Sequence, residues 1–215
     1  MIKGKKELID LFNMEQEHME DVDEAIDHGI LVANLAYRLA KELGYSQEFC
    51  EKMADAGILH DIGKMKISGY LYGRRKNVLK IEEIKYVRKH PALGYDFLTK
   101  ENIVDEESRQ MILHHHENVD GSGYPDNMKG DDIPVGSRIL RISDVYSALV
   151  SERPYRAAFD KETAMELMID EVKNFDMKFF LAFMRVVHAD DFVEIDEYVE
   201  NCNAKTHVKE IGIAN

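Results

Sequence analysis

Five histidines and one aspartate, spread over three separate segments of the chain, restrict the possible folds more than any other feature of the sequence. His60 and Asp61 end an apolar run, while His90 and the histidine triplet 114–116 lie further along the chain. A charged side chain in an apolar segment is costly to bury unless it is paired or bound to a cation. We therefore expect the segments to fold around a shared partner, and histidine with carboxylate is a ligand set that suits divalent metals.

The apolar residues recur at helical spacing. Between residues 22 and 43 they return every three, four or seven positions, which marks one buried helix face, and Gly44 follows as a helix stop. Further helices are expected at about 46–61, 81–98 with a break near Pro91, 106–117 and 137–152, with two or three more between 161 and 200. No run alternates like a strand, so the predicted fold class is all-α.

Composition excludes several classes of protein. A chain of 215 residues can bury a core without disulfides, and its two cysteines, Cys50 and Cys202, have no metal-ligand spacing, which fits a reducing compartment. No apolar stretch is long enough to span a bilayer, so we expect a cytoplasmic protein without membrane contact. The net charge of −13 argues against binding a nucleic acid polymer, although bound metals would still allow an anionic substrate.

Several candidate residues also have an ordinary structural interpretation. Glu24 and His28 are four residues apart and share a helix face, but such pairs are common on solvated helices. His60 and Asp61 could be a core histidine beside a capping aspartate. Lys64 follows His60 by four residues and could reach a substrate phosphate, or it could simply face solvent.

The downstream candidates leave a similar choice open. Asp144 is an acid in an apolar run, and three neighbouring histidines are expensive to bury without a partner. Arg153 and Arg156 flank a turn stiffened by Pro154 and could bind phosphate oxygens with two hydrogen bonds each, or they could belong to an exposed loop.

Taken together and in this order, the motifs resemble the HD-GYP domain, a branch of the HD phosphohydrolase superfamily. The resemblance runs from Ile26 to Val187 and is carried by the strings His60-Asp61-Ile62-Gly63-Lys64, His90-Pro91, His115-His116-Glu117, Asp120-Gly121-Ser122-Gly123-Tyr124-Pro125, Ser143-Asp144-Val145-Tyr146-Ser147-Ala148-Leu149 and Arg153-Pro154-Tyr155-Arg156. It implies an HD-domain helical bundle with an appended GYP loop. We expect residues 1–20 to be an N-terminal extension, 21–188 the domain, and 189–215 a C-terminal helix and tail.

The resemblance also implies a chemistry. Members of this family hold two or three divalent metals, most often iron and alternatively manganese, and hydrolyse cyclic di-GMP to pGpG, and some continue to GMP, by attack of a metal-bridging hydroxide. Some prefer mixed cyclic GMP-AMP. By position, the implied metal ligands are His28, His60, Asp61, His90, His115, His116 and Asp144, with Glu24 at a third metal.

Asp61 would bridge two metals, and Asp61 and Lys64 are the implied catalytic residues. Lys64, Tyr124, Arg153 and Arg156 are the implied substrate contacts. The resemblance also suggests a protein partner with a diguanylate cyclase domain, and a homodimer is a further expectation.

Three departures from the family pattern concern substrate choice more than metal binding. Leu31 stands where an arginine is usual, Val119 replaces a tryptophan, and residues 68–80 form an unusually basic stretch that could act as a lid. Two other functions are considered, an HD-type phosphohydrolase of another nucleotide and a non-catalytic receptor or docking module. The additional histidines 90, 115 and 116 argue against the first, and the complete set of ligands argues against the second.

Overall fold

The computed structural model describes residues 19–67, 81–153 and 156–212, with side chains described between residues 23 and 206 of these ranges. Within them the chain is helical and contains no strand, which confirms the all-α prediction. Arg153 and Arg156 form an isolated antiparallel bridge. The α-helices are α2 (Met19–Glu42), α3 (Gln47–Leu59), α5 (Ile81–Val87), α6 (His90–Glu101), α7 (Glu106–Leu113), α8 (Val135–Val150), α9 (Lys161–Asp170), α10 (Met177–Val187) and α11 (Val193–Gly212). The short 3-10 helices are η2 (Ile62–Ile67), η3 (Gly130–Asp132), η4 (Val172–Asn174) and η5 (Asp190–Phe192).

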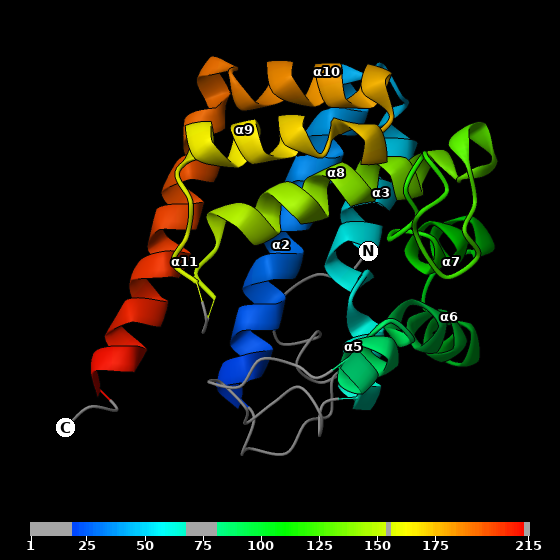
Figure 1. The fold of residues 1–215 in the computed structure, drawn as a ribbon, viewed down its shortest axis with the longest axis horizontal. Coiled ribbons are helices and arrows are strands. Elements are labelled where there is room, and N and C mark those ends of the chain that lie inside the picture. The colour runs from blue at the N-terminus through cyan, green and yellow to red at the C-terminus, as the bar shows by residue number, and fades with distance from the viewer. Residues whose placement is uncertain (1–18, 68–80, 154–155, 213–215) are drawn as a thin grey trace.

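The core is built around α2 and α3, which pack closely against each other, while α8 crosses α2 (Figure 1). Leu35 and Leu39 of α2 are fully buried, as is Met53 of α3. A Cβ atom on Gly57 would lie 2.6 Å from the Cα of Ala33, so the two backbones approach at a distance that only glycine allows. The apolar face predicted from the spacing of residues 22–43 is the face that α2 buries from Ile26 to Ala40, and the side chain of Val22 lies outside the described ones.

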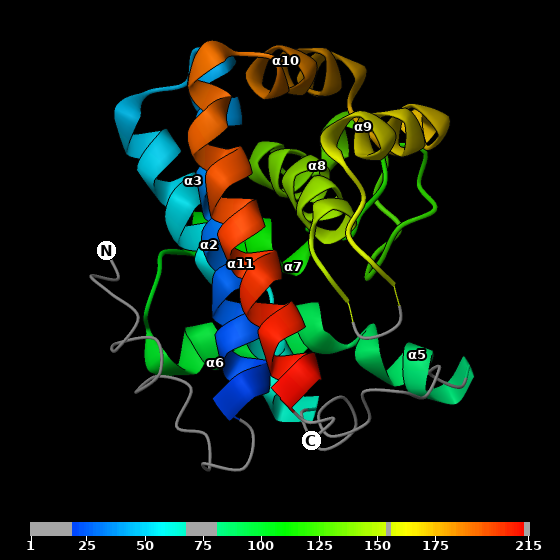
Figure 2. The same ribbon diagram turned by 90° about the vertical axis from the view of Figure 1, so that its left-hand side faces the viewer.

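Helices α10 and α11 complete the bundle. Phe179, Phe180 and Phe183 of α10 are buried, and Phe183 makes an edge-to-face contact with Tyr146 of α8 at 5.3 Å between ring centroids. Helix α11 runs beside α2 (Figure 2), and the guanidinium of Arg38 on α2 binds the carboxylate of Glu194 on α11 at 2.6 Å. The aromatic residues of α10 therefore belong to the core. Among the described helices, none is long and apolar enough to cross a membrane.

Two helix boundaries bear on the site. The predicted helix 81–98 is two helices separated between Val87 and His90, and Pro91 lies in the first turn of α6, where its missing N–H costs no hydrogen bond. The predicted end of the helix 106–117 is wrong, because α7 ends at Leu113 and the histidine triplet lies in the turn that follows. The basic stretch 68–80, predicted as a lid, lies outside the described residues.

Candidate metal centre

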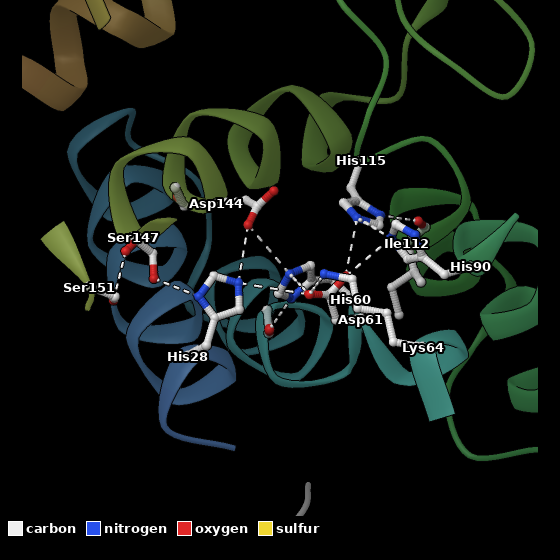
Figure 3. A network of polar contacts seen from close by, with 12 residues as sticks. His28, His60, Asp61, Lys64, His90, Ile112, His115, Asp144, Ser147 and Ser151 are labelled. Carbon is white, nitrogen blue, oxygen red and sulfur yellow. Dashed lines mark hydrogen bonds and ion pairs between the residues drawn. The ribbon is translucent and has the colours of Figure 1, made fainter. Parts of the chain in front are cut away.

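The fold brings seven of the eight predicted metal ligands into two adjacent clusters (Figure 3). In each cluster the atoms that could bind a metal lie within 4.8 Å of one another. The first cluster contains His28 of α2, His60 at the end of α3 and Asp144 of α8; the second contains Asp61, His90 of α6, and His115 and His116 from the turn after α7. Glu24 lies one turn before His28 on α2 and lines a cavity with it, without belonging to either cluster.

Asp61 connects the two clusters through its two carboxylate oxygens. Oδ2 lies 3.3 Å from Nε2 of His60 and 3.8 Å from Nε2 of His28, in the first cluster. Oδ1 lies 3.1 Å from Nε2 of His90 and 3.9 Å from Nε2 of His115, in the second. One oxygen therefore faces each cluster, which is the arrangement that a carboxylate bridging two metal ions requires.

The spacing between Asp61 and His90 is set by a backbone contact. A Cβ atom on Gly63 would lie 1.9 Å from the carbonyl oxygen of His90 and 2.6 Å from the amide nitrogen of Gly94, so η2 and α6 touch main chain to main chain. No other residue type fits at position 63 without separating these two elements.

Four of the five clustered histidines are oriented by contacts of Nδ1 outside the cluster, which leave Nε2 directed into it. In three of them Nδ1 donates to the backbone carbonyl three residues earlier: His60 to Gly57 at 2.8 Å, His90 to Val87 at 2.8 Å and His115 to Ile112 at 2.6 Å. Nδ1 of His28 instead lies 2.9 Å from the hydroxyl of Ser147 on α8. Such outer contacts fix the tautomer and ring orientation of metal-binding histidines.

Two buried atoms at the junction of the clusters test whether these residues suit a cation. Nε2 of His60 and Oδ1 of Asp61 are buried and make no hydrogen bond with any described residue. Oδ1 lies 3.1 Å from Nε2 of His90, close enough to bond but without hydrogen-bonding geometry. Buried polar atoms without partners are costly, and a divalent ion in each cluster would satisfy one of the two. The residues therefore fit a metal.

The electrostatics of the clusters favour the ionisation states that a metal needs. Burial lowers the pKa of His28, and lowers the pKa values of His115 and His116 well below the usual range, so these imidazoles are neutral. Burial opposes the charge of both Asp61 and Asp144. The charges of Lys64 and His60 nevertheless hold the carboxyl pKa of Asp61 well below its usual range, and the hydrogen bond from His28 with the charge of His60 does the same for Asp144.

His60 differs from the other clustered histidines. Burial lowers its pKa, but the carboxylates of Asp61 and Asp144 outweigh burial and raise the pKa to about 10. In the metal-free protein His60 therefore carries a proton between two carboxylates, and metal binding has to displace it.

Lys64 and Tyr124, two of the predicted functional residues, lie against the clusters. The ammonium of Lys64 on η2 is 2.5 Å from Oδ2 of Asp61. The ring of Tyr124 stacks on His116 with 4.7 Å between centroids, and the guanidinium of Arg88 lies 5.2 Å from the centre of the Tyr124 ring. Tyr124 therefore contacts a member of the second cluster directly.

The GYP loop, residues 118–134, is organised by the buried carboxylate of Glu117. That carboxylate accepts the backbone N–H groups of Asp126 at 2.7 Å and Met128 at 3.1 Å, while the peptide between Tyr124 and Pro125 is cis. A Cβ on Gly123 would lie 2.4 Å from the Cα of Glu117, which makes glycine necessary there. The loop is thus folded back onto the turn that carries the second cluster.

The two predicted phosphate-binding arginines have different surroundings. Arg153 lines the same cavity as Glu24 and His28. Arg156 instead directs its guanidinium at the end of α8, where it donates to the carbonyls of Ala148 at 2.7 Å and Leu149 at 3.1 Å. The last carbonyls of a helix lack partners within the helix, and Arg156 supplies them. The structure therefore does not bring Arg156 to the clusters.

Sequence reasoning missed Ser147 and Arg88, and gave no role to His114. Ser147 follows Asp144 by three residues on α8, so its helix spacing could have indicated the contact with His28. Arg88 has no such signal, because its contact with Tyr124 crosses from one helix to a distant loop. His114 lies outside both clusters, with Nε2 3.0 Å from the carboxylate of Asp126.

An all-helical bundle in which a His-Asp pair at a helix end connects two histidine clusters defines the class of HD-type metal-binding domains. The HD domain model matches residues 6–179, so the chain belongs to the HD domain family, and the resemblance to its HD-GYP branch is confirmed.

Three relatives illustrate this relationship. The cyclic di-GMP phosphodiesterase response regulator RpfG of Xanthomonas campestris pv. campestris is 35% identical over 62% of this chain and 35% of its own length. The 3'3'-cGAMP-specific phosphodiesterase 2 of Vibrio cholerae is 32% identical over 76% of this chain and 31% of its own length. The solved structure of Bd1817, an HDG"Y"P protein from Bdellovibrio bacteriovorus, superposes with a TM-score of 0.63 at 19% identity, over 86% of this chain and 58% of that one. The chain spans about a third of the length of these two curated relatives.

Proposed function

We propose that the protein is a metal-dependent phosphodiesterase that hydrolyses cyclic di-GMP to pGpG; whether it continues to GMP is left to the product analysis below. The observation that carries the proposal is the position of Asp61, with one carboxylate oxygen toward each of two histidine clusters. The reaction class is supported by relatives that are phosphodiesterases of cyclic dinucleotides. Mixed cyclic GMP-AMP is a second candidate substrate, because a relative specific for it is of similar identity.

The metals would be held by the two clusters. His28, His60 and Asp144 would bind one ion, His90, His115 and His116 a second, and Asp61 would be shared between them. Glu24 would serve a third ion, with iron or manganese as the metal. Bound there, such ions would lower the pKa of a water molecule and offset charge on the phosphate oxygens.

The remaining residues would bind and orient the substrate. Lys64, whose ammonium lies against Asp61, would offset negative charge on a phosphate oxygen. Arg153 lies in the cavity beside His28 and would bind a phosphate. Tyr124 would form a wall next to His116. Arg156 is proposed to hold the segment that carries Arg153, in place of the phosphate contact expected from the sequence.

The test is hydrolysis of cyclic di-GMP and 3'3'-cGAMP by anaerobically prepared protein loaded with Fe(II) or Mn(II), with products separated by chromatography. Formation of pGpG or GMP from cyclic di-GMP is the expected result, and metal-free protein is the control. Tight binding without product, in protein verified to hold metal, would identify a receptor. Turnover of mononucleotides alone would identify a different HD phosphohydrolase.

Cytoplasmic location, a homodimer and a partner with a diguanylate cyclase domain stay predictions.

A further inference from the structure

The C-terminal helix α11 lies beyond the segment that the HD domain model matches, yet it forms one wall of the cavity next to the first cluster. The model match ends at residue 179, and α11 begins at Val193. The hydroxyl of Tyr198 on α11 donates to the backbone carbonyl of Asp27 on α2 at 3.3 Å, which fixes the two helices side by side (Figure 2). The geometry of this wall is therefore specific to the part of the chain outside the common domain.

Asn203 of α11 forms two hydrogen bonds with the turn that follows α8. Its Nδ2 donates to the carbonyl of Val150 at 3.0 Å, and its Oδ1 accepts the N–H of Glu152 at 2.9 Å. Both partners are main-chain groups on either side of Ser151, so one side chain fixes the course of the backbone through this turn. Arg153 is the next residue along the chain.

Arg156 also binds this segment, through hydrogen bonds to the end of α8 and to Arg153. Its guanidinium donates to carbonyls at the end of α8, and its backbone forms two hydrogen bonds with Arg153, at 2.9 and 3.0 Å. The backbone of Arg153 is therefore fixed between α8 and α11, and it cannot move independently of Asn203.

The fixed segment that carries Arg153 borders a cavity next to the first cluster. It has a volume of about 50 Å³ and is lined by Glu24 and His28 of α2, Cys202 and Asn203 of α11, and Arg153.

We propose that Asn203 is a positioning residue, which fixes Arg153 beside the His28 end of the centre so that its guanidinium can bind a substrate phosphate. The inference rests on the proposed function in one respect, because it takes Arg153 as a phosphate contact. A side chain carried by a fixed backbone loses less conformational entropy on binding than one carried by a mobile segment. Asn203 thus contributes to phosphate affinity without touching the substrate.

The test is calorimetric titration of Mn(II)-loaded protein with inorganic phosphate, comparing Asn203→Ala with Asn201→Ala. Asn201 is an exposed asparagine of the same helix and is a matched control. We expect Asn203→Ala to weaken phosphate binding roughly tenfold, as a small misplacement of a binding group does, and Asn201→Ala to leave it unchanged. Asn203→Asp keeps the acceptor for Glu152 and loses the donor to Val150, so it should give a smaller loss in a fold that is less disturbed.

A double-variant cycle separates positioning from a general effect on folding. If Asn203 acts through Arg153, adding Asn203→Ala to Arg153→Ala should cause no further loss of phosphate affinity. In steady-state assays KM should rise about as much as phosphate affinity falls, with kcat within roughly twofold and metal content unchanged.

Three results would overturn the inference: wild-type phosphate affinity in Asn203→Ala, wild-type affinity in Arg153→Ala, or a full additional loss in the double variant. Absence of cyclic dinucleotide hydrolysis by the wild type would instead contradict the proposed function, and the phosphate titration would still decide the role of Asn203.

Discussion

The two clusters of the candidate metal centre are built on different kinds of structure. His28, His60 and Asp144 come from the long helices α2, α3 and α8, whose apolar faces form the core. In the second cluster, His115 and His116 lie in a turn after a short helix, and the GYP loop folds against that turn. The first cluster is therefore held by the packing of the core, whereas the second depends on a small number of polar contacts.

Because the two clusters are held differently, substitutions near one cluster should affect the other less. Loss of a buried polar contact costs free energy locally, whereas core packing is distributed over many residues. Substitutions in the loop should therefore weaken the second cluster while leaving the first intact, and a substitution at the shared carboxylate should affect both.

The largest effect is expected for Asp61→Ala, which removes the only residue that faces both clusters among the described part of the chain. Hydrolysis should fall by roughly a thousandfold or more, and bound metal should fall below one ion per chain. The measurements are product formation and metal content by mass spectrometry. Asp96→Ala, which changes an exposed aspartate of α6, is the control, and an active, metal-replete Asp61→Ala would contradict the site.

Glu117→Ala should break the second cluster selectively. It leaves the N–H groups of Asp126 and Met128, whose hydrogen bonds are partly buried, without their acceptor, at a cost of about 2–4 kcal/mol for two charge-assisted bonds. We expect a lower Tm and the loss of one metal ion, with the ion at the first cluster retained. Glu117→Gln keeps one acceptor oxygen and should lie between this variant and the wild type. Equal loss of both ions would show that the clusters are not independent.

Ser147→Ala should be the corresponding, smaller change at the first cluster. It removes the hydroxyl next to Nδ1 of His28 but leaves the core helices in place. Affinity for one metal ion should fall about tenfold, as is typical when the outer contact of a metal-binding histidine is lost. Competition with a chelator measures this affinity, and Ser151→Ala on the same segment is the control. An unchanged affinity would mean that packing alone orients His28.

The last effect is that of pH on stability, and it is expected only in metal-free protein. The folded-state pKa of His60 is raised to about 10, so its contribution to stability is complete below its unfolded pKa near 6.5 and declines as pH rises. The free energy of unfolding of metal-free protein should therefore decrease between pH 6.5 and 9. Urea unfolding across this range measures it, with His60→Gln as the control. A slope that is identical after Mn(II) is added would contradict the assignment of His60 to the metal site.

The helices follow from local patterns in the sequence, whereas the full set of cluster residues was implied by the family resemblance; the structure brings seven of these residues together, and their role as metal ligands stays a prediction. Helical spacing identified the buried face of α2, and apolar surroundings made Asp61 and Asp144 conspicuous. The end of α7 was missed because the turn at His114 is fixed by long-range contacts, among them that of Nε2 with Asp126. The roles of Arg156 and Asn203 depend on carbonyls at the end of α8, and no spacing rule reports which distant side chain will satisfy them.

The backbone contact at Gly63 limits how a centre of this kind can change during evolution. Because η2 and α6 meet through their backbones there, the distance between Asp61 and His90 is fixed by main chain rather than by the choice of side chains. Exchanging one ligand for another can therefore alter which ion is preferred, while the separation of the two clusters is inherited with the fold. Adaptation to a different substrate is directed to the periphery, to α11, which contributes no residue to either cluster.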